Sequence, residues 1–119
     1  MFKVNEDMSI YVTRGDSIIL GVSAEGYKYK DDDVVRFKVF EKKECESVVL
    51  QKDFSPASED EVDIILSGED TKLGEYISKP KDYWYEIELN PDTDPKTIIG
   101  YDEDGAKVFR LFPEGGEMP

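Results

Sequence analysis

Residues 82–90 alternate between two faces, and this alternation constrains the fold more than any other feature of the sequence. In an extended chain, successive side chains point to opposite sides. One side here carries Tyr83, Tyr85, Ile87 and Leu89, and the other carries Trp84, Glu86 and Glu88. This pattern is typical of a half-buried β-strand. Such a strand needs a second sheet or a helix over its apolar face, so the rest of the chain must supply that cover.

The remaining sequence supplies mostly further strands. Period-2 alternation or β-forming residues occur in seven other segments, at 8–13, 17–23, 34–41, 47–54, 61–67, 96–101 and 106–112. We therefore predict an all-β fold, an immunoglobulin-like two-sheet β-sandwich of about seven to eight antiparallel strands, with a barrel as the rival architecture. Residues 69–74 predict one short helical turn that crosses between the sheets.

Turn residues predict how the strands are connected. A charged turn at 42–46 favours a hairpin between 34–41 and 47–54, and the first two strands form a corner or a hairpin. Asp-Gly at Asp104 and Gly105 predicts a second hairpin, between 96–101 and 106–112. Tyr83 or Tyr85 is expected to act as a tyrosine corner whose hydroxyl bonds upstream backbone. The predicted organisation is an N-terminal arm at 1–7, a β-sandwich domain at 8–112 and a C-terminal tail at 113–119.

Length and charge limit the class of protein. A chain of 119 residues suits one domain, and its 12% of aromatic residues favours a folded core. Fifteen basic and 28 acidic residues give a net charge of -13, which repels phosphate backbones and anionic membranes. We therefore expect no nucleic-acid partner. The sequence shows neither a signal peptide nor a long apolar run, so we expect no membrane insertion and a cytoplasmic location on synthesis.

The residue types argue against catalysis. The chain has no histidine and one cysteine, Cys45, so an internal disulfide, a Ser-His-Asp or Cys-His site and a histidine-ligated metal are all excluded. We predict no enzyme activity, no catalytic, metal or cofactor-binding residues and no cofactor. Asp31, Asp32 and Asp33 invite a metal hypothesis but lack the alternating spacing of calcium loops. The Arg14-Gly15-Asp16 triplet, which integrins bind, is interpreted here as turn chemistry.

Two aromatic residues occupy outward positions on strong strands. If 34–41 pairs antiparallel with 82–90, Phe40 lies beside Trp84 on the outer face. Exposed together, they favour contact with another protein; alternatively, the tail or the 26–33 loop covers them. Phe40 and Trp84 are thus the candidate contact residues for protein or glycan. The second function class is a carbohydrate-binding module that uses this pair as an aromatic platform.

The order of these features resembles the N-terminal immunoglobulin-like domain of phage and prophage baseplate upper proteins of Gram-positive hosts, or a stand-alone prophage protein of that type. The resembling residues cover nearly the whole chain: Arg14-Gly15-Asp16, Val35-Arg36-Phe37-Lys38-Val39, residues 70–76, residues 83–89 and Thr97-Ile98-Ile99-Gly100. The resemblance implies a non-enzymatic structural or adaptor domain that binds other tail proteins or itself. It also implies association with the virion after assembly.

Overall fold

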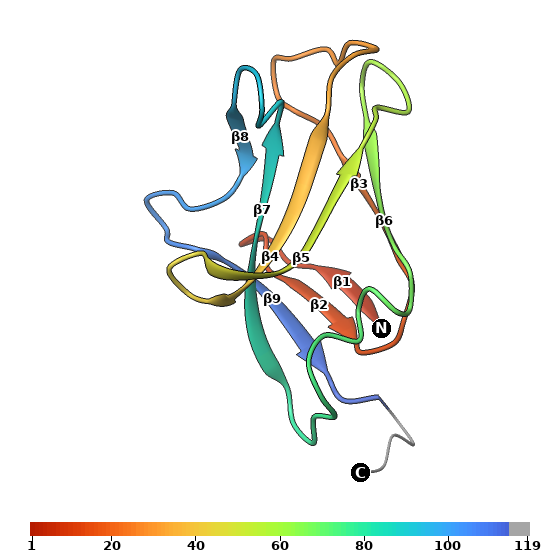
Figure 1. Cartoon of the computed structure of the whole chain (residues 1–119), viewed down its shortest axis with the longest axis vertical. Helices are drawn as coiled ribbons and strands as arrows, with labels where there is room; N and C mark the ends of the chain where they lie inside the picture. The colour runs from red at the N-terminus through yellow and green to blue at the C-terminus, as the bar shows by residue number, and fades with distance from the viewer. Residues whose placement is uncertain (115–119) are drawn as a thin grey trace.

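The computed structural model describes residues 1–114, and the protein is all-β (Figure 1). Each of the eight predicted segments overlaps one strand, and a further strand lies within the predicted N-terminal arm. In chain order the strands are β1 (Phe2–Val4), β2 (Ile10–Thr13), β3 (Ile18–Val22), β4 (Val35–Lys42), β5 (Glu46–Phe54), β6 (Val62–Leu66), β7 (Lys81–Leu89), β8 (Lys96–Ile99) and β9 (Lys107–Phe112). Residues 115–119 of the predicted tail lie outside the described residues.

The strands form two sheets that pack around one core, as predicted. The larger sheet has the order β1-β2-β9-β7-β4-β5, with β8 also paired to β7, and the smaller sheet consists of β3 and β6. Figure 1 shows β3 and β6 together on one flank of the molecule. The first two predicted strands make the corner rather than the hairpin, since β2 and β3 belong to different sheets. The predicted hairpin between β4 and β5 is confirmed.

The prediction that all strands are antiparallel is wrong for one pair. Strand β2 runs parallel to β9, with Ile10 opposite Phe109 and Val12 opposite Leu111. Short connections force neighbouring strands to be antiparallel, whereas strands from distant parts of the chain are free to pair in either direction. Strands β2 and β9 come from opposite ends of the described chain, so no tight turn dictates their direction.

The predicted hairpin around Gly105 is also wrong. The local turn exists, because the Gly105 N–H donates to the Asp102 carbonyl at 2.9 Å and Gly105 has a φ of 97°. The flanking strands do not pair with each other, however. Both β8 and β9 run antiparallel to β7, with Ile99 opposite Ile87 and Lys107 opposite Tyr85. The long edge of β7 thus takes up both strands end to end, and the residues between them form a protruding loop.

The predicted helical turn near 69–74 is absent from the described part of the chain, where this segment forms hydrogen-bonded turns. The Thr71 N–H donates to the Ser67 carbonyl at 3.3 Å, but the Asp70 carboxylate also accepts from the Ser67 N–H at 2.8 Å. Such side-chain bonds to nearby backbone compete with helix formation. Gly74, with a φ of 64°, then turns the chain. The segment does cross from β6 to β7, as predicted.

The core confirms the alternation in β7. Tyr83, Tyr85, Ile87 and Leu89 are all buried between the sheets. The ring of Phe37 on β4 packs 5.8 Å from the ring of Tyr85 and 6.1 Å from that of Phe109, measured between centroids. The Tyr85 hydroxyl donates to the Met8 carbonyl, 77 residues upstream, so it joins distant segments and does not form the local tyrosine corner that the sequence predicted. The aromatic centre therefore joins β4, β7, β9 and the segment before β2.

None of the residues placed in the structure belongs to a helix that is long and apolar enough to cross a membrane.

Candidate functional site

Phe40 and Trp84 lie opposite each other on the outer face of the larger sheet. The register of β4 and β7 pairs them directly, as predicted from antiparallel pairing. Val48 on β5 and Val108 on β9 extend this row across four strands. Phe40 is only 5% exposed, however, and Trp84 is half-buried. The row is therefore a narrow apolar strip with little open aromatic surface, and the contact role of Phe40 and Trp84 stays a prediction.

Cys45 lies in the turn between β4 and β5, near this strip. Its backbone has a φ of 58°, and its side chain is half-buried. Burial, followed by the negative charges of Glu86 and Glu44, raises the pKa of the Cys45 thiol. A thiol with a raised pKa is protonated at neutral pH and is a poor nucleophile. This environment favours a packing role for Cys45 over a role as a nucleophile.

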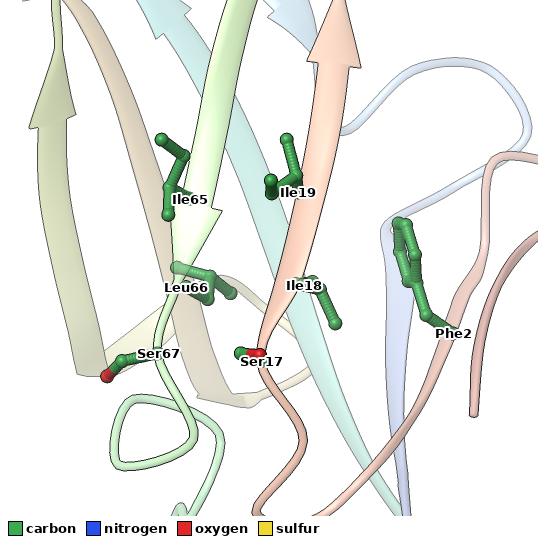
Figure 2. A pocket seen from close by; sticks show the side chains of 7 residues that line it. All are labelled: Phe2, Ser17, Ile18, Ile19, Ile65, Leu66 and Ser67. Atoms are coloured by element: carbon green, nitrogen blue, oxygen red, sulfur yellow. The ribbon is translucent and has the colours of Figure 1, made fainter.

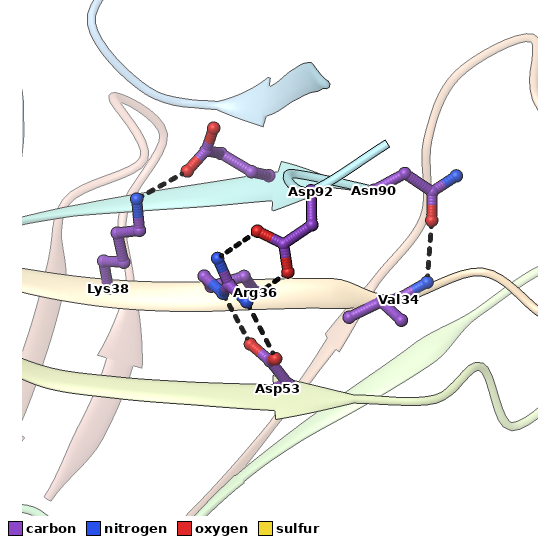
Figure 3. Close-up of polar contacts among 7 residues, drawn as sticks. Val34, Arg36, Lys38, Asp53, Asn90 and Asp92 are labelled. Carbon is purple, nitrogen blue, oxygen red and sulfur yellow. Dashed lines mark hydrogen bonds and ion pairs between the residues drawn. The ribbon is translucent and has the colours of Figure 1, made fainter. Parts of the chain in front are cut away.

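Next to the strip, the outer face carries a ladder of paired charges (Figure 3). The Arg36 guanidinium donates to both carboxylate oxygens of Asp53, at 2.7 and 3.0 Å, and to Asp92 at 3.0 Å. Lys38 forms an ion pair with Glu88 at 2.9 Å. The hydrogen bonds from Arg36 lower the pKa of the Asp53 carboxyl. Because these charges satisfy one another, this half of the face offers few free charges to a partner.

The three adjacent aspartates do not act together. Asp31 and Asp32 are exposed, whereas Asp33 is buried. The Asp33 carboxylate accepts hydrogen bonds from the Tyr27 hydroxyl at 2.7 Å, the Lys30 N–H at 2.8 Å and the Asn90 amide at 3.0 Å. Across residues 1–114, no three acidic or cysteine side chains are grouped so that they could hold a metal ion. Asp33 therefore organises its own loop and ties it to the end of β7.

This network makes stability depend on pH. Burial raises the pKa of the Asp33 carboxyl, but the hydrogen bonds from Asn90, Lys30 and Tyr27 outweigh it and hold the pKa below its usual value. A depressed pKa contributes stability above the unfolded-state value of about 3.9, and this contribution is lost as the pH falls through the folded-state pKa. We expect Asp33→Asn to be most destabilising above about pH 5, with a difference from wild type that shrinks below about pH 4.

Urea unfolding measured at a series of pH values checks this expectation. Asp32→Asn is the matched control, because Asp32 is the exposed neighbour of the same type. The control should leave the pH profile close to that of the wild type. A penalty for Asp33→Asn that stays constant down to about pH 3 would contradict the assignment of the charged form as the hydrogen-bond acceptor.

The Arg14-Gly15-Asp16 triplet lies in the corner between β2 and β3. The Arg14 side chain is buried, and its guanidinium donates to the Gly74 carbonyl at 3.0 Å. The Asp16 carboxylate instead forms an ion pair with the N-terminal amine at 2.6 Å. A receptor that reads the triplet needs access to both side chains together, and the burial of Arg14 prevents this. The structure therefore favours the turn interpretation of the triplet.

A second apolar surface lies on the outer face of the smaller sheet. Ile19 on β3 and Ile65 on β6 are cross-strand partners, and they are 63% and 52% exposed. Figure 2 shows the two side chains at the same height on neighbouring strands. This pair was not predicted from the sequence, where only the aromatic residues Phe40 and Trp84 are contact candidates. The signal was present, because an isoleucine occupied an outward position in each of the segments 17–23 and 61–67.

A hollow of about 440 Å³ adjoins this pair. Phe2 stands across it, on the side of β3 that faces away from β6 (Figure 2). The lining residues come from β1, β3 and β6 and the residues that flank β3 and β6: Phe2, Ser17, Ile18, Ile19, Ile65, Leu66 and Ser67. Phe2, like the two isoleucines, is exposed. The lining is therefore mainly apolar.

The described residues thus present two candidate contact surfaces, a largely covered strip on the larger sheet and an exposed isoleucine pair on the smaller sheet. No family model, no curated protein and no solved structure matches this chain.

Proposed function

We propose that this chain is a non-enzymatic structural or adaptor domain that acts by protein–protein contact, of the immunoglobulin-like type found in phage and prophage tails or baseplates. The observation that carries this proposal is the exposed cross-strand pair of Ile19 and Ile65 on the outer face of the smaller sheet. Its partners are other tail proteins, with which it associates in the virion after assembly.

The exposed pair supports a contact role on energetic grounds. Burying an isoleucine side chain is worth about 1.5–3 kcal/mol relative to leaving it exposed. Two adjacent isoleucines therefore offer a partner a compact source of binding energy. Clusters of exposed apolar side chains are typical of protein contact sites, whereas single ones are ordinary. Phe2 and the adjoining hollow enlarge the apolar area beyond the two side chains.

The strand arrangement supports the immunoglobulin-like part of the proposal. In immunoglobulin variable-type sandwiches, strands B and E belong to one sheet, and strands C, F and G belong to the other. Here β3 and β6 form the smaller sheet, while β4, β7 and β9 are neighbours in the larger one. The parallel pairing of β2 with β9 joins the two ends of the described chain at one sheet edge. These features support the immunoglobulin-like part of the proposal, and the phage and baseplate part rests on the sequence resemblance alone.

The proposal is tested by replacing Ile19 and Ile65 together with serine. We expect the wild-type chain to co-elute in a fixed stoichiometry with at least one protein encoded by flanking tail genes, and the double variant to lose that complex. Size-exclusion chromatography with light scattering measures both. Val49→Ser is the control, because Val49 is an exposed β-branched residue on the other sheet and lies outside the row of Phe40, Trp84, Val48 and Val108. Thermal unfolding should show that all variants stay folded.

Two results would count against the proposal. A gene neighbourhood without tail genes removes the phage assignment, and a complex that survives the double variant removes the isoleucine face as the contact. The alternative of a carbohydrate-binding module rests on Trp84, since Phe40 contributes almost no surface. Glycan-array binding that is lost in Trp84→Ala would favour that alternative.

A further inference from the structure

We propose that the groove between β1 and β3 binds an extended segment of a partner protein as an added β-strand along the free edge of β3, and that this segment alternates apolar with basic residues. The inference rests on the proposed function, because it specifies the mode and chemistry of the protein contact. Strand addition of this kind is a common way for a sheet to bind a peptide.

Two unpaired strand edges border the groove. Within the part of the chain that the structure describes, β3 pairs only with β6, and β1 pairs only with β2. One hollow brings Phe2 of β1 together with Ile18 and Ile19 of β3. A second hollow, of about 180 Å³, brings Val4 of β1 together with residues 20–22 of β3. The groove therefore follows β3 along its whole length.

The core beneath the groove is incompletely covered. Ile18, Leu20 and Val22 occupy the inward positions of β3, and the first and last of these are buried. Leu20 between them is only partly buried, although it packs against the core. The second hollow reaches the core residues Ile10 and Tyr85. An added strand would point alternate side chains into this gap, so those side chains need to be apolar.

The charges around the groove select a basic partner. At one end the Glu61 carboxylate lies against Gly21, so close that a Cβ on Gly21 would be 2.9 Å from it, and Asp63 is the cross-strand partner of Gly21. In the corner before β3, the Glu114 carboxylate lies against Gly15. Lys3 alternates with Phe2 and Val4, which places its side chain on the opposite face of β1.

A second copy of the chain is a poor occupant, because each copy carries a net charge of -13. A segment with lysine or arginine at its outward positions complements the acidic side chains beside β3 and in the corner before it. The five residues of β3 span roughly 17 Å at the usual rise per strand residue, so about five to seven partner residues fill the groove.

The test uses a synthetic peptide of about nine residues that alternates valine with lysine. A peptide of the same composition with the valines and lysines in separate blocks is the control for charge alone. We expect the alternating peptide to bind at least about tenfold more tightly by isothermal titration calorimetry. We also expect it to slow hydrogen exchange at alternate backbone amides of β3. Only the amides whose N–H points toward the groove gain a hydrogen-bond partner, because the others already face β6.

Matched variants locate the site. Val4→Lys places a positive charge in the groove and should weaken the peptide about tenfold or more. Val49→Lys makes the same change on β5, far along the sheet order, and should leave binding close to wild type. The two valines are 41% and 39% exposed, so they are equivalent in burial.

Three outcomes would overturn the strand-addition inference: no binding of the alternating peptide, equal binding of both peptides, or binding without protection of β3. None of these affects the proposed function, which depends on the complex with a tail protein and on Ile19 with Ile65. In the converse case, the alternating peptide protects β3 while the isoleucine double variant still forms the tail-protein complex. That combination of results would support the groove as the binding site and reject the isoleucine face.

Discussion

Phe37→Ala is expected to lower the free energy of unfolding by about 3–5 kcal/mol. Phe37 is 1% exposed, and its ring packs against the rings of Tyr85 and Phe109, so truncation leaves a cavity where β4, β7 and β9 meet. Folded domains of this size are stable by only about 5–15 kcal/mol, so the loss is a large share of the total. Urea unfolding should show a lower midpoint with an unchanged slope.

Phe54→Ala is the matched control for this prediction. Phe54 is also a phenylalanine on the larger sheet, but it lies on the edge strand β5 and is only partly buried. Its surroundings are partly solvent, so truncation removes less buried surface and leaves no closed cavity. We expect a loss below about 3 kcal/mol. Equal losses for the two variants would show that stability is not concentrated at the aromatic centre.

Thr71→Val is expected to cost about 2–3 kcal/mol although it preserves the shape of the side chain. Thr71 is fully buried, and its hydroxyl accepts from the Gly15 N–H at 3.0 Å and lies 2.8 Å from the Asp16 carbonyl, to which it donates. Valine leaves that donor and that acceptor without a partner in a place that water does not reach. The two chain segments that cross between the sheets would then lose their mutual anchor.

Thr71→Ser separates the hydroxyl from the methyl group. Serine retains both hydrogen bonds and loses only one methyl, so we expect a cost of about 1 kcal/mol. Thermal and urea unfolding of both variants give the comparison. If Thr71→Ser were as destabilising as Thr71→Val, the packing of the methyl group and not the hydrogen bonds would hold the corner.

Local pattern was enough to predict the strands. The alternation at 82–90 predicted which side of β7 is buried. The pairing of Phe40 with Trp84 needed one further assumption, that 34–41 pairs antiparallel with 82–90, and the register confirms it. Side-chain direction in a strand depends on the backbone geometry of that strand alone, so it can be read without knowledge of the neighbours. The same holds for the hairpin between β4 and β5, where turn residues act over a few positions. Turn residues also predicted the break after β2, but only the structure decided that it is a corner and not a hairpin.

Partner choice between strands could not be predicted in the same way. Asp-Gly at Asp104 and Gly105 makes a turn, yet β8 and β9 both pair with β7 and not with each other. Burial of outward residues was equally hidden. Phe40 is 5% exposed and Ile19 is 63% exposed, although both occupy outward positions on their strands. This difference depends on the surrounding segments and not on the residue's own strand.

The amino-acid sequence by itself determined that this chain builds alternating strands, which of their faces turn inward, and that no histidine-based chemistry is available, since these depend on residue type and near neighbours. Only the tertiary structure decided that Arg14 is buried in a corner, that Asp33 accepts a hydrogen bond from Asn90, and that β1 and β3 leave an open groove between the sheets. Those outcomes depend on contacts between residues far apart in the chain, whose energies no local pattern encodes.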